Sequence, residues 1–127
     1  MSSQTILVVD DDERLLQTLA ILVRHLGHQV LTAPDVATAA TLLDTHEVDL
    51  VVTDLRMPNL EGPDLYRAVR QRYADDPPRF IFMSANTGIE EYATFLSETG
   101  EPALEKPFNL ADMRQVVLQV LAQKPRA

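Results

Sequence analysis

Residues 51–59 read VVTDLRMPN, an apolar run that ends on an aspartate and is followed by a turn-forming segment with Pro58. The run is rich in β-branched side chains, which are typical of strands that are buried on both faces of a parallel sheet. We expect a strand over 49–53. Asp54 then stands at the tip of a buried strand, where an unpaired charge is costly. The stretch therefore indicates a site at the end of this strand.

The same alternation of apolar strand and amphipathic helix recurs along the whole chain. Short apolar runs predict strands, and apolar residues at helical spacing between them predict helices. The expected strands cover 5–9, 29–33, 49–53, 80–83 and 103–105. The first expected helix comes after the acidic run at 10–13 and is followed by Gly27. Pro34 and Asp35 start the second helix, Gly62 and Pro63 open the third, the fourth covers 90–98, and Asn109 caps the last. Five β-α repeats imply an α/β fold whose parallel sheet carries helices on both faces.

Length and composition restrict the class of protein. The 127 residues suit one domain, 1–127, with a core of about 4–123. A net charge of −8 disfavours binding to nucleic acid or to an anionic membrane. The absence of cysteine excludes disulfides and thiol chemistry. No apolar run approaches the ~20 residues of a membrane span, and the N-terminus lacks signal-peptide features. We expect a cytoplasmic protein.

Reactive side chains follow four of the five expected strands. They are Asp10 and Asp11, Asp54, Ser84, and Lys106. In an open parallel sheet the carboxyl ends of the strands share one edge, where ligands bind. The sequence therefore predicts one polar site at this edge.

The residue types at this edge suit phosphoryl transfer. Two carboxylates about 4 Å apart repel by roughly 4 kcal/mol at an effective dielectric near 20, so clustered acids need a cation. Hard oxygen ligands favour Mg²⁺, which is often shared with a phosphate. An aspartate facing a phosphorylated donor can act as a nucleophile and form an acyl phosphate. Mg²⁺, Lys106 and Ser84 would together stabilise the oxygens of the transferring group.

Four motifs carry a resemblance to a known family. They are ILVVDDD at 6–12, VVTDLRMPNLEG at 51–62, IFMSA at 81–85 and EKPF at 105–108. Their order and spacing resemble the receiver domain of bacterial two-component response regulators. GEPALEKPF at 100–108 is more similar to receivers attached to hybrid sensor kinases than to receivers of transcription factors.

The resemblance implies a single flavodoxin-like (βα)5 domain with strand order 2-1-3-4-5. It implies that Asp54 accepts a phosphoryl group from a sensor histidine kinase or a histidine phosphotransfer protein. Ser84 would contact that group and Lys106 would pair with it. Mg²⁺ would be bound by Asp11, by Asp54, by the main-chain carbonyl of Arg56 and, through water, by Asp10. The domain would not be an enzyme beyond its own phosphorylation and dephosphorylation.

Further details follow from the same resemblance. The Lys106–Pro107 bond is expected to be cis. Arg56 and Asn86, two residues beyond Asp54 and Ser84, occupy positions that tune hydrolysis in the family. Many members carry a tyrosine or phenylalanine in place of Ala103, and that ring turns inward on activation. Alanine has no ring, so we expect phosphorylation to change this domain locally more than globally.

Simpler or different interpretations exist for the same residues. The acidic run at 11–13 contains a helix cap, for which Asp12 is the best candidate. A haloacid-dehalogenase-like phosphatase would use Asp10 as nucleophile and Asp12 as acid, but it would leave Asp54 without a role. A pseudo-receiver that binds partners without phosphorylation would not need the full set of site residues.

Overall fold

The computed structural model describes residues 3–56, 62–85 and 92–123 of the chain. Five strands form one sheet in the order β2-β1-β3-β4-β5, and every neighbouring pair is parallel. The strands are β1 Thr5–Val9, β2 Gln29–Ala33, β3 Leu50–Asp54, β4 Arg79–Ala85 and β5 Ala103–Lys106. This arrangement confirms the predicted fold class and strand order.

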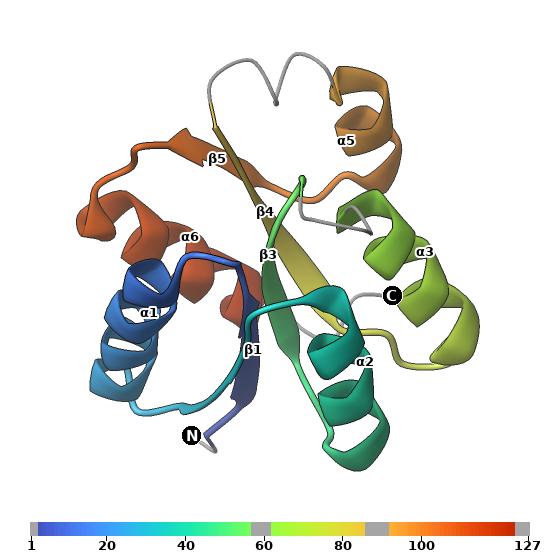
Figure 1. The fold of residues 1–127 in the computed structure, drawn as a ribbon, viewed down its shortest axis with the longest axis horizontal. Coiled ribbons are helices and arrows are strands. Elements are labelled where there is room, and N and C mark those ends of the chain that lie inside the picture. Colours follow the sequence, from blue (N-terminus) through green and yellow to red (C-terminus); the bar gives the residue numbers. More distant parts are fainter. Residues whose placement is uncertain (1–2, 57–61, 86–91, 124–127) are drawn as a thin grey trace.

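Helices cover both faces of the sheet (Figure 1). They are α1 Glu13–His25, α2 Val36–Thr45, α3 Gly62–Arg72, α5 Ala93–Thr99 and α6 Leu110–Ala122. Helices α1 and α6 lie on one face, and α2, α3 and α5 lie on the other. This sandwich follows from parallel strands, because each right-handed crossover places its helix on one face of the sheet.

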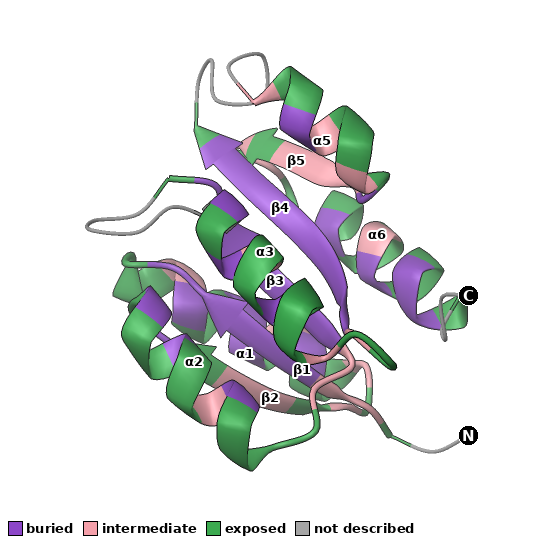
Figure 2. Cartoon of the chain, turned by 90° about the vertical axis from the view of Figure 1, so that its right-hand side faces the viewer, coloured by how far each residue is buried: buried purple, intermediate pink, exposed green. Residues whose placement is uncertain are grey.

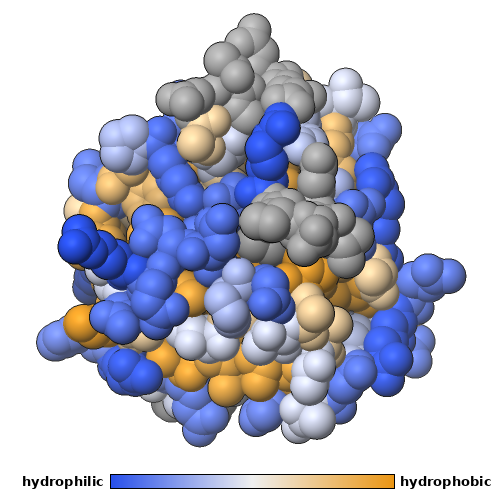
Figure 3. Space-filling model, viewed as in Figure 1, coloured by the Kyte–Doolittle hydropathy of each residue, from blue (hydrophilic) through white to orange (hydrophobic). Residues whose placement is uncertain are grey.

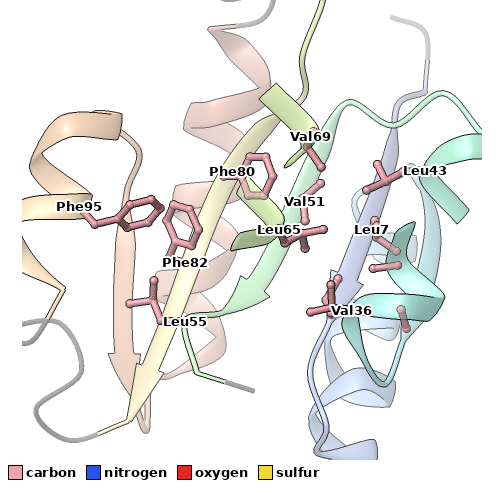
Figure 4. Packing of buried hydrophobic residues seen from close by; sticks show 13 residues of the cluster. Leu7, Val36, Leu43, Val51, Leu55, Leu65, Val69, Phe80, Phe82 and Phe95 are labelled. Atoms are coloured by element: carbon pink, nitrogen blue, oxygen red, sulfur yellow. The ribbon is translucent and has the colours of Figure 1, made fainter. Parts of the chain in front are cut away.

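Side-chain alternation along the strands divides the core into two clusters. Val51, Phe80 and Phe82 pack towards α2, α3 and α5, whereas Leu50 and Ile81 pack towards α1 and α6. Strands β1, β3 and β4 are buried along almost their whole length (Figure 2). Figure 4 shows the first cluster, in which Phe80 and Phe82 lie between the sheet and the helices. A sheet buried on both faces explains why the strands read as continuous apolar runs.

The predicted helix caps are confirmed. Asp12 accepts hydrogen bonds from the backbone of Arg14 and Leu15, and Asn109 accepts one from the backbone of Asp112. Asp35 caps α2 in the same way. Gly27, just beyond α1, has φ +88°, a conformation that side chains disfavour.

Several element bounds differ from the prediction by one or a few residues. β3 begins and ends one residue later than expected. It ends on Asp54 because this residue pairs in register with Met83 of β4. β4 begins one residue before and ends two residues after the predicted strand 80–83. β5 ends at Lys106, one residue later than predicted. The described helix α5 begins at Ala93. The first two residues of the predicted helix 90–98 lie outside the described residues.

The surface is mixed in character. Hydrophilic residues cover most of the rim of the molecule in the view of Figure 3. Ile21, Leu110 and Leu118 are the large hydrophobic residues exposed in the described part of the chain. Within that part, every helix is too short or too polar to cross a lipid bilayer.

Candidate functional site

The carboxyl ends of the central strands bring two buried aspartates to one edge of the sheet. Asp10 directly follows β1, and its backbone N–H donates to the carbonyl of Ala33 at 3.1 Å, which extends the β1–β2 pairing. Asp10 is completely buried, and Asp54, the last residue of β3, is 9% exposed. Because β1 and β3 are neighbours, both carboxylates lie at the same edge, as the sequence predicted.

Lys106 joins the two aspartates. It ends β5, which β4 separates from β3, yet its Nζ lies 2.6 Å from Oδ2 of Asp10 and 2.8 Å from Oδ2 of Asp54. Burial alone would lower the pKa of Lys106, but the hydrogen bonds and charges of the two carboxylates outweigh it and raise that pKa above its usual value. The lysine is therefore a protonated counter-ion within the site.

The other oxygen of each buried carboxylate accepts a backbone hydrogen bond from the turn that follows it. Asp10 Oδ1 accepts from the N–H of Asp12 at 2.8 Å. Asp54 Oδ1 accepts from the N–H of Arg56 at 3.0 Å. Aspartate commonly forms such bonds to the residue two positions ahead. The local sequence thus orients both carboxylates as the chain leaves the strand.

The acidic cluster has the donor set of a divalent cation site. Asp10, Asp11 and Asp54 each offer a carboxylate oxygen, and these oxygens lie within 4.8 Å of one another. Asp11 is exposed, whereas Asp10 is buried, so the cluster opens to solvent on one side. Three carboxylates beside one ammonium leave two uncompensated negative charges. Oxygen ligands with this excess of negative charge fit Mg²⁺.

Ser84 lies within β4 rather than after it, and no hydrogen bond joins it to Asp54 or Lys106 among the described residues. Ser84 is buried in β4, one residue beyond Met83, the register partner of Asp54. The Lys106–Pro107 bond is cis, as the resemblance implied. Asn86 lies outside the described residues.

Two features of the site were not found from the sequence. The Thr53 hydroxyl is buried and donates to the carbonyl of Asp54 at 3.1 Å. The guanidinium carbon of Arg56 lies 5.8 Å from the ring centroid of Tyr92. Tyr92 is distant from Arg56 in the sequence, and no motif links the two residues. Only the packing of α5 against the sheet brings them together.

The arrangement bears on the phosphatase alternative. Asp12, which would have to act as the acid, uses its carboxylate to cap α1. Asp54, which would have no role in a phosphatase, is instead bonded to Lys106.

Comparisons with known proteins agree with the fold. The response regulator receiver domain family matches residues 6–118. The chain is 34% identical over 121 residues to sensor histidine kinase RcsC of Salmonella typhi, covering 95% of this chain and 12% of that protein. It is 32% identical over 124 residues to the transcriptional regulatory protein PrrA of Mycobacterium tuberculosis, covering 98% and 52%. The transcriptional regulator NtrC of Azospirillum brasilense is 32% identical over 121 residues, covering 95% and 25%.

The chain thus spans 52% or less of the length of these relatives, which include both a sensor kinase and transcriptional regulators. Among solved structures, the non-phosphorylated HemR receiver domain from Leptospira biflexa has a TM-score of 0.86 at 29% identity, covering 98% of this chain and 99% of that chain. The receiver domain of an HD domain-containing protein from Pseudomonas fluorescens Pf-5 has a TM-score of 0.85 at 28% identity, covering 96% and 97%. The chain belongs to the response regulator receiver domain family of two-component signalling.

Proposed function

We propose that Asp54 is the phosphoacceptor of this receiver domain. A carboxylate oxygen of Asp54 attacks the phosphorus of a phosphohistidine, so that an O–P bond forms as the N–P bond breaks and the histidine nitrogen leaves. The observation that carries this assignment is the placement of Lys106, whose ammonium lies 2.8 Å from Asp54. An ammonium at this distance can compensate the charge of the incoming phosphoryl oxygens.

The roles of the other residues follow from their positions. Asp10, Asp11 and Asp54, with the main-chain carbonyl of Arg56, would hold Mg²⁺. When bound, Mg²⁺ neutralises part of the charge on the phosphoryl oxygens. The backbone N–H of Arg56 orients Asp54 by holding Oδ1. Lys106 is held between Asp10 and Asp54 and therefore needs little movement to meet the transferred group.

Ser84 would contact the phosphoryl group after a movement of its side chain. By strand alternation it shares the face of Phe80 and Phe82, whereas Lys106 shares the face of Leu104. A phosphoryl group on Asp54 offers three acceptor oxygens, which would draw the Ser84 hydroxyl towards it. The domain would catalyse only its own phosphorylation and dephosphorylation.

The proposed donor is a histidine-phosphorylated protein, either a sensor histidine kinase or a histidine phosphotransfer protein. Membership of the response regulator receiver domain family and the similarity to a sensor histidine kinase support such a donor. The downstream partner is a protein that distinguishes the two states of the domain.

Mass spectrometry tests the assignment directly. The chain is incubated with Mg²⁺ and acetyl phosphate, and the intact mass and the modified peptide are measured. We expect one phosphate on the peptide that contains Asp54, and none after Asp54→Asn. Asp12→Ser keeps a capping residue and should still be phosphorylated. Phosphate on Asp10 would support the phosphatase alternative, and no phosphate at all would support a pseudo-receiver.

A further inference from the structure

We propose that Tyr92 is a positioning residue that couples the phosphoacceptor turn, residues 54–56, to helix α5. The tyrosine ring holds the side chain of Arg56, and the backbone of Arg56 holds Asp54. This inference rests on the proposed role of Asp54 and identifies the contact through which α5 responds to its phosphorylation.

The first link joins Asp54 to Arg56. The Arg56 N–H donates to Asp54 Oδ1 at 3.0 Å, so the conformation of this turn depends on the state of the carboxylate. A phosphoryl group on Asp54 changes the charge and the geometry of the acceptor. Phosphorylation of Asp54 therefore changes the hydrogen bond that the backbone N–H of Arg56 donates.

The second link joins Arg56 to α5. The guanidinium carbon of Arg56 lies 5.8 Å from the ring centroid of Tyr92, within the range of a cation–π contact. Tyr92 is the N-cap residue of α5, but its side chain makes no capping hydrogen bond. Arg56 is exposed and Tyr92 is half-buried.

The third link fixes Tyr92 and α5 to the sheet. Tyr92 packs against the core cluster that contains Phe95 of α5 and Phe82 of β4. The rings of Phe82 and Phe95 are 5.3 Å apart and lie side by side in Figure 4. Tyr66 of α3 lies 5.5 Å from Phe95. Helix α5 is therefore held through Phe95, and a displacement at Tyr92, its N-cap residue, would reach this helix.

Ala103 makes this route significant. It lies opposite Phe82 in the register of β4 and β5 and packs at the margin of the same cluster. With alanine at this position, β5 has no ring there that could turn when the site changes. Tyr92, the N-cap residue of α5, instead places an aromatic ring against Arg56.

The expected size of the effect follows from the contact. A ligand shifts a conformational equilibrium only through contacts that differ between the two states. An exposed cation–π contact changes an equilibrium by about two- to fivefold. A phosphoryl group attracts the guanidinium that Tyr92 holds, so the contact between Arg56 and Tyr92 differs between the unphosphorylated and phosphorylated states.

The chain offers a matched control. Arg70 lies over Tyr66 at 5.8 Å, the same distance that separates Arg56 from Tyr92. Tyr66 also packs against the cluster of Phe82 and Phe95, but no hydrogen bond joins Arg70 to Asp54 among the contacts found in the described ranges. Arg70→Gln therefore removes an equivalent contact without affecting the proposed route.

NMR spectroscopy of the whole chain tests the inference, with beryllofluoride and Mg²⁺ as the phosphoryl mimic. We expect Tyr92→Leu to abolish the ring-current shift of the Arg56 Nε–H proton. The same variant should reduce the beryllofluoride-induced amide shift changes across Ala93–Thr99 about two- to fivefold. The changes at Asp10 and Ser84 should remain. Tyr92→Phe keeps the ring and should retain the ring-current shift of Arg56, and Arg70→Gln should behave as the original chain.

A second variant tests the inference even if Tyr92→Leu fails to fold. Arg56→Gln changes an exposed side chain and should reduce the α5 response as Tyr92→Leu does. Undiminished α5 changes in both variants would overturn the inference and leave the proposed function intact. An equal loss in Arg70→Gln would also overturn it, since the effect would then arise from general packing. If the unaltered chain shows no beryllofluoride response at Asp54, the proposed function and this inference both fail.

Discussion

The Nζ atom of Lys106 lies 2.8 Å from Oδ2 of Asp54, although 52 positions separate the two residues in the chain. The same atom lies 2.6 Å from Oδ2 of Asp10. One ammonium is therefore shared by two buried carboxylates. Any further cation that enters the site shares these acids with the lysine, so metal binding and the position of Lys106 are coupled.

Replacing Lys106 with methionine should strengthen Mg²⁺ binding and slow phosphorylation. The ammonium repels the metal and competes for two of its acids, so its removal should tighten binding about tenfold, which corresponds to ~1.4 kcal/mol. Acceptance of phosphate should fall, because the transferred group loses its cationic partner. Isothermal titration with Mg²⁺ and phosphorylation by acetyl phosphate measure the two effects. Lys106→Arg keeps the charge and is the control. An unchanged Mg²⁺ affinity in the methionine variant would contradict the coupling.

Asp10→Ala and Asp11→Ala should each remove most of the Mg²⁺ affinity of the chain. Each variant loses one of the three clustered carboxylates and its charge. Fluorescence or NMR titration with Mg²⁺ gives the dissociation constants. Asp12→Ser is the matched control, because Asp12 caps α1 and a serine can replace it in that role. If both alanine variants bind Mg²⁺ as the unaltered chain does, the metal assignment is wrong.

Asp54→Asn should fold and should not be phosphorylated. Two opposite effects act on its stability. The substitution removes a charge from a crowded acidic site, but it also weakens the ion pair with Lys106. We expect the free energy of unfolding to change by less than about 1 kcal/mol in the absence of metal. Urea denaturation with and without Mg²⁺ measures this change. A much larger loss in the free energy of unfolding would mean that the Asp54–Lys106 pair stabilises the fold as a whole.

Glu101→Gln should destabilise the domain strongly. Glu101 is buried and accepts hydrogen bonds from Arg79 Nε at 2.8 Å and from the backbone N–H of Phe80 at 3.0 Å. Removing its charge leaves the guanidinium of Arg79 buried without an anion, a change that costs about 3–5 kcal/mol in comparable pairs. Urea denaturation gives the value. The double variant Arg79→Met with Glu101→Leu should recover much of the loss.

The exposed pair of Arg72 and Asp44 provides the comparison for this buried pair. Its nitrogen and oxygen are 3.1 Å apart, but both side chains are about half exposed or more, at 64% and 47%. Asp44→Asn should therefore cost less than about 1 kcal/mol. Similar losses in Asp44→Asn and Glu101→Gln would show that burial does not decide the strength of the Arg79–Glu101 pair.

Asp35→Ser should make the stability of the domain less dependent on pH in the acid range. The hydrogen bonds from Thr38 lower the pKa of Asp35 below its usual value. A lowered folded-state pKa gives stability that is present above the unfolded-state pKa and is lost as the pH falls through the folded-state pKa. Serine keeps the cap but does not titrate. Thermal unfolding between pH 3 and pH 7 should show a shallower acid loss in the variant, and identical slopes would contradict this account.

The order of the elements and most of the site residues are determined by local sequence. The five strands and the described helices follow from apolar periodicity, and the caps at Asp12, Asp35 and Asn109 follow from residue type. The alternation of strands and helices implies a parallel sheet, and a parallel sheet places the residues that follow its strands at one edge. This is why Asp10, Asp54 and Lys106 could be assigned to one site before their contacts were known.

The contacts between distant side chains were decided by the tertiary structure. Lys106 reaches Asp54 across β4, Arg79 pairs with Glu101, and Arg56 lies over Tyr92. Each pair joins separate elements, so its geometry depends on strand order, register and helix packing rather than on local propensity. The end of β3 also depended on the tertiary structure, because Asp54 belongs to the strand through its pairing with Met83 of β4. The sequence determined which groups meet at the sheet edge, and packing determined which of their atoms touch.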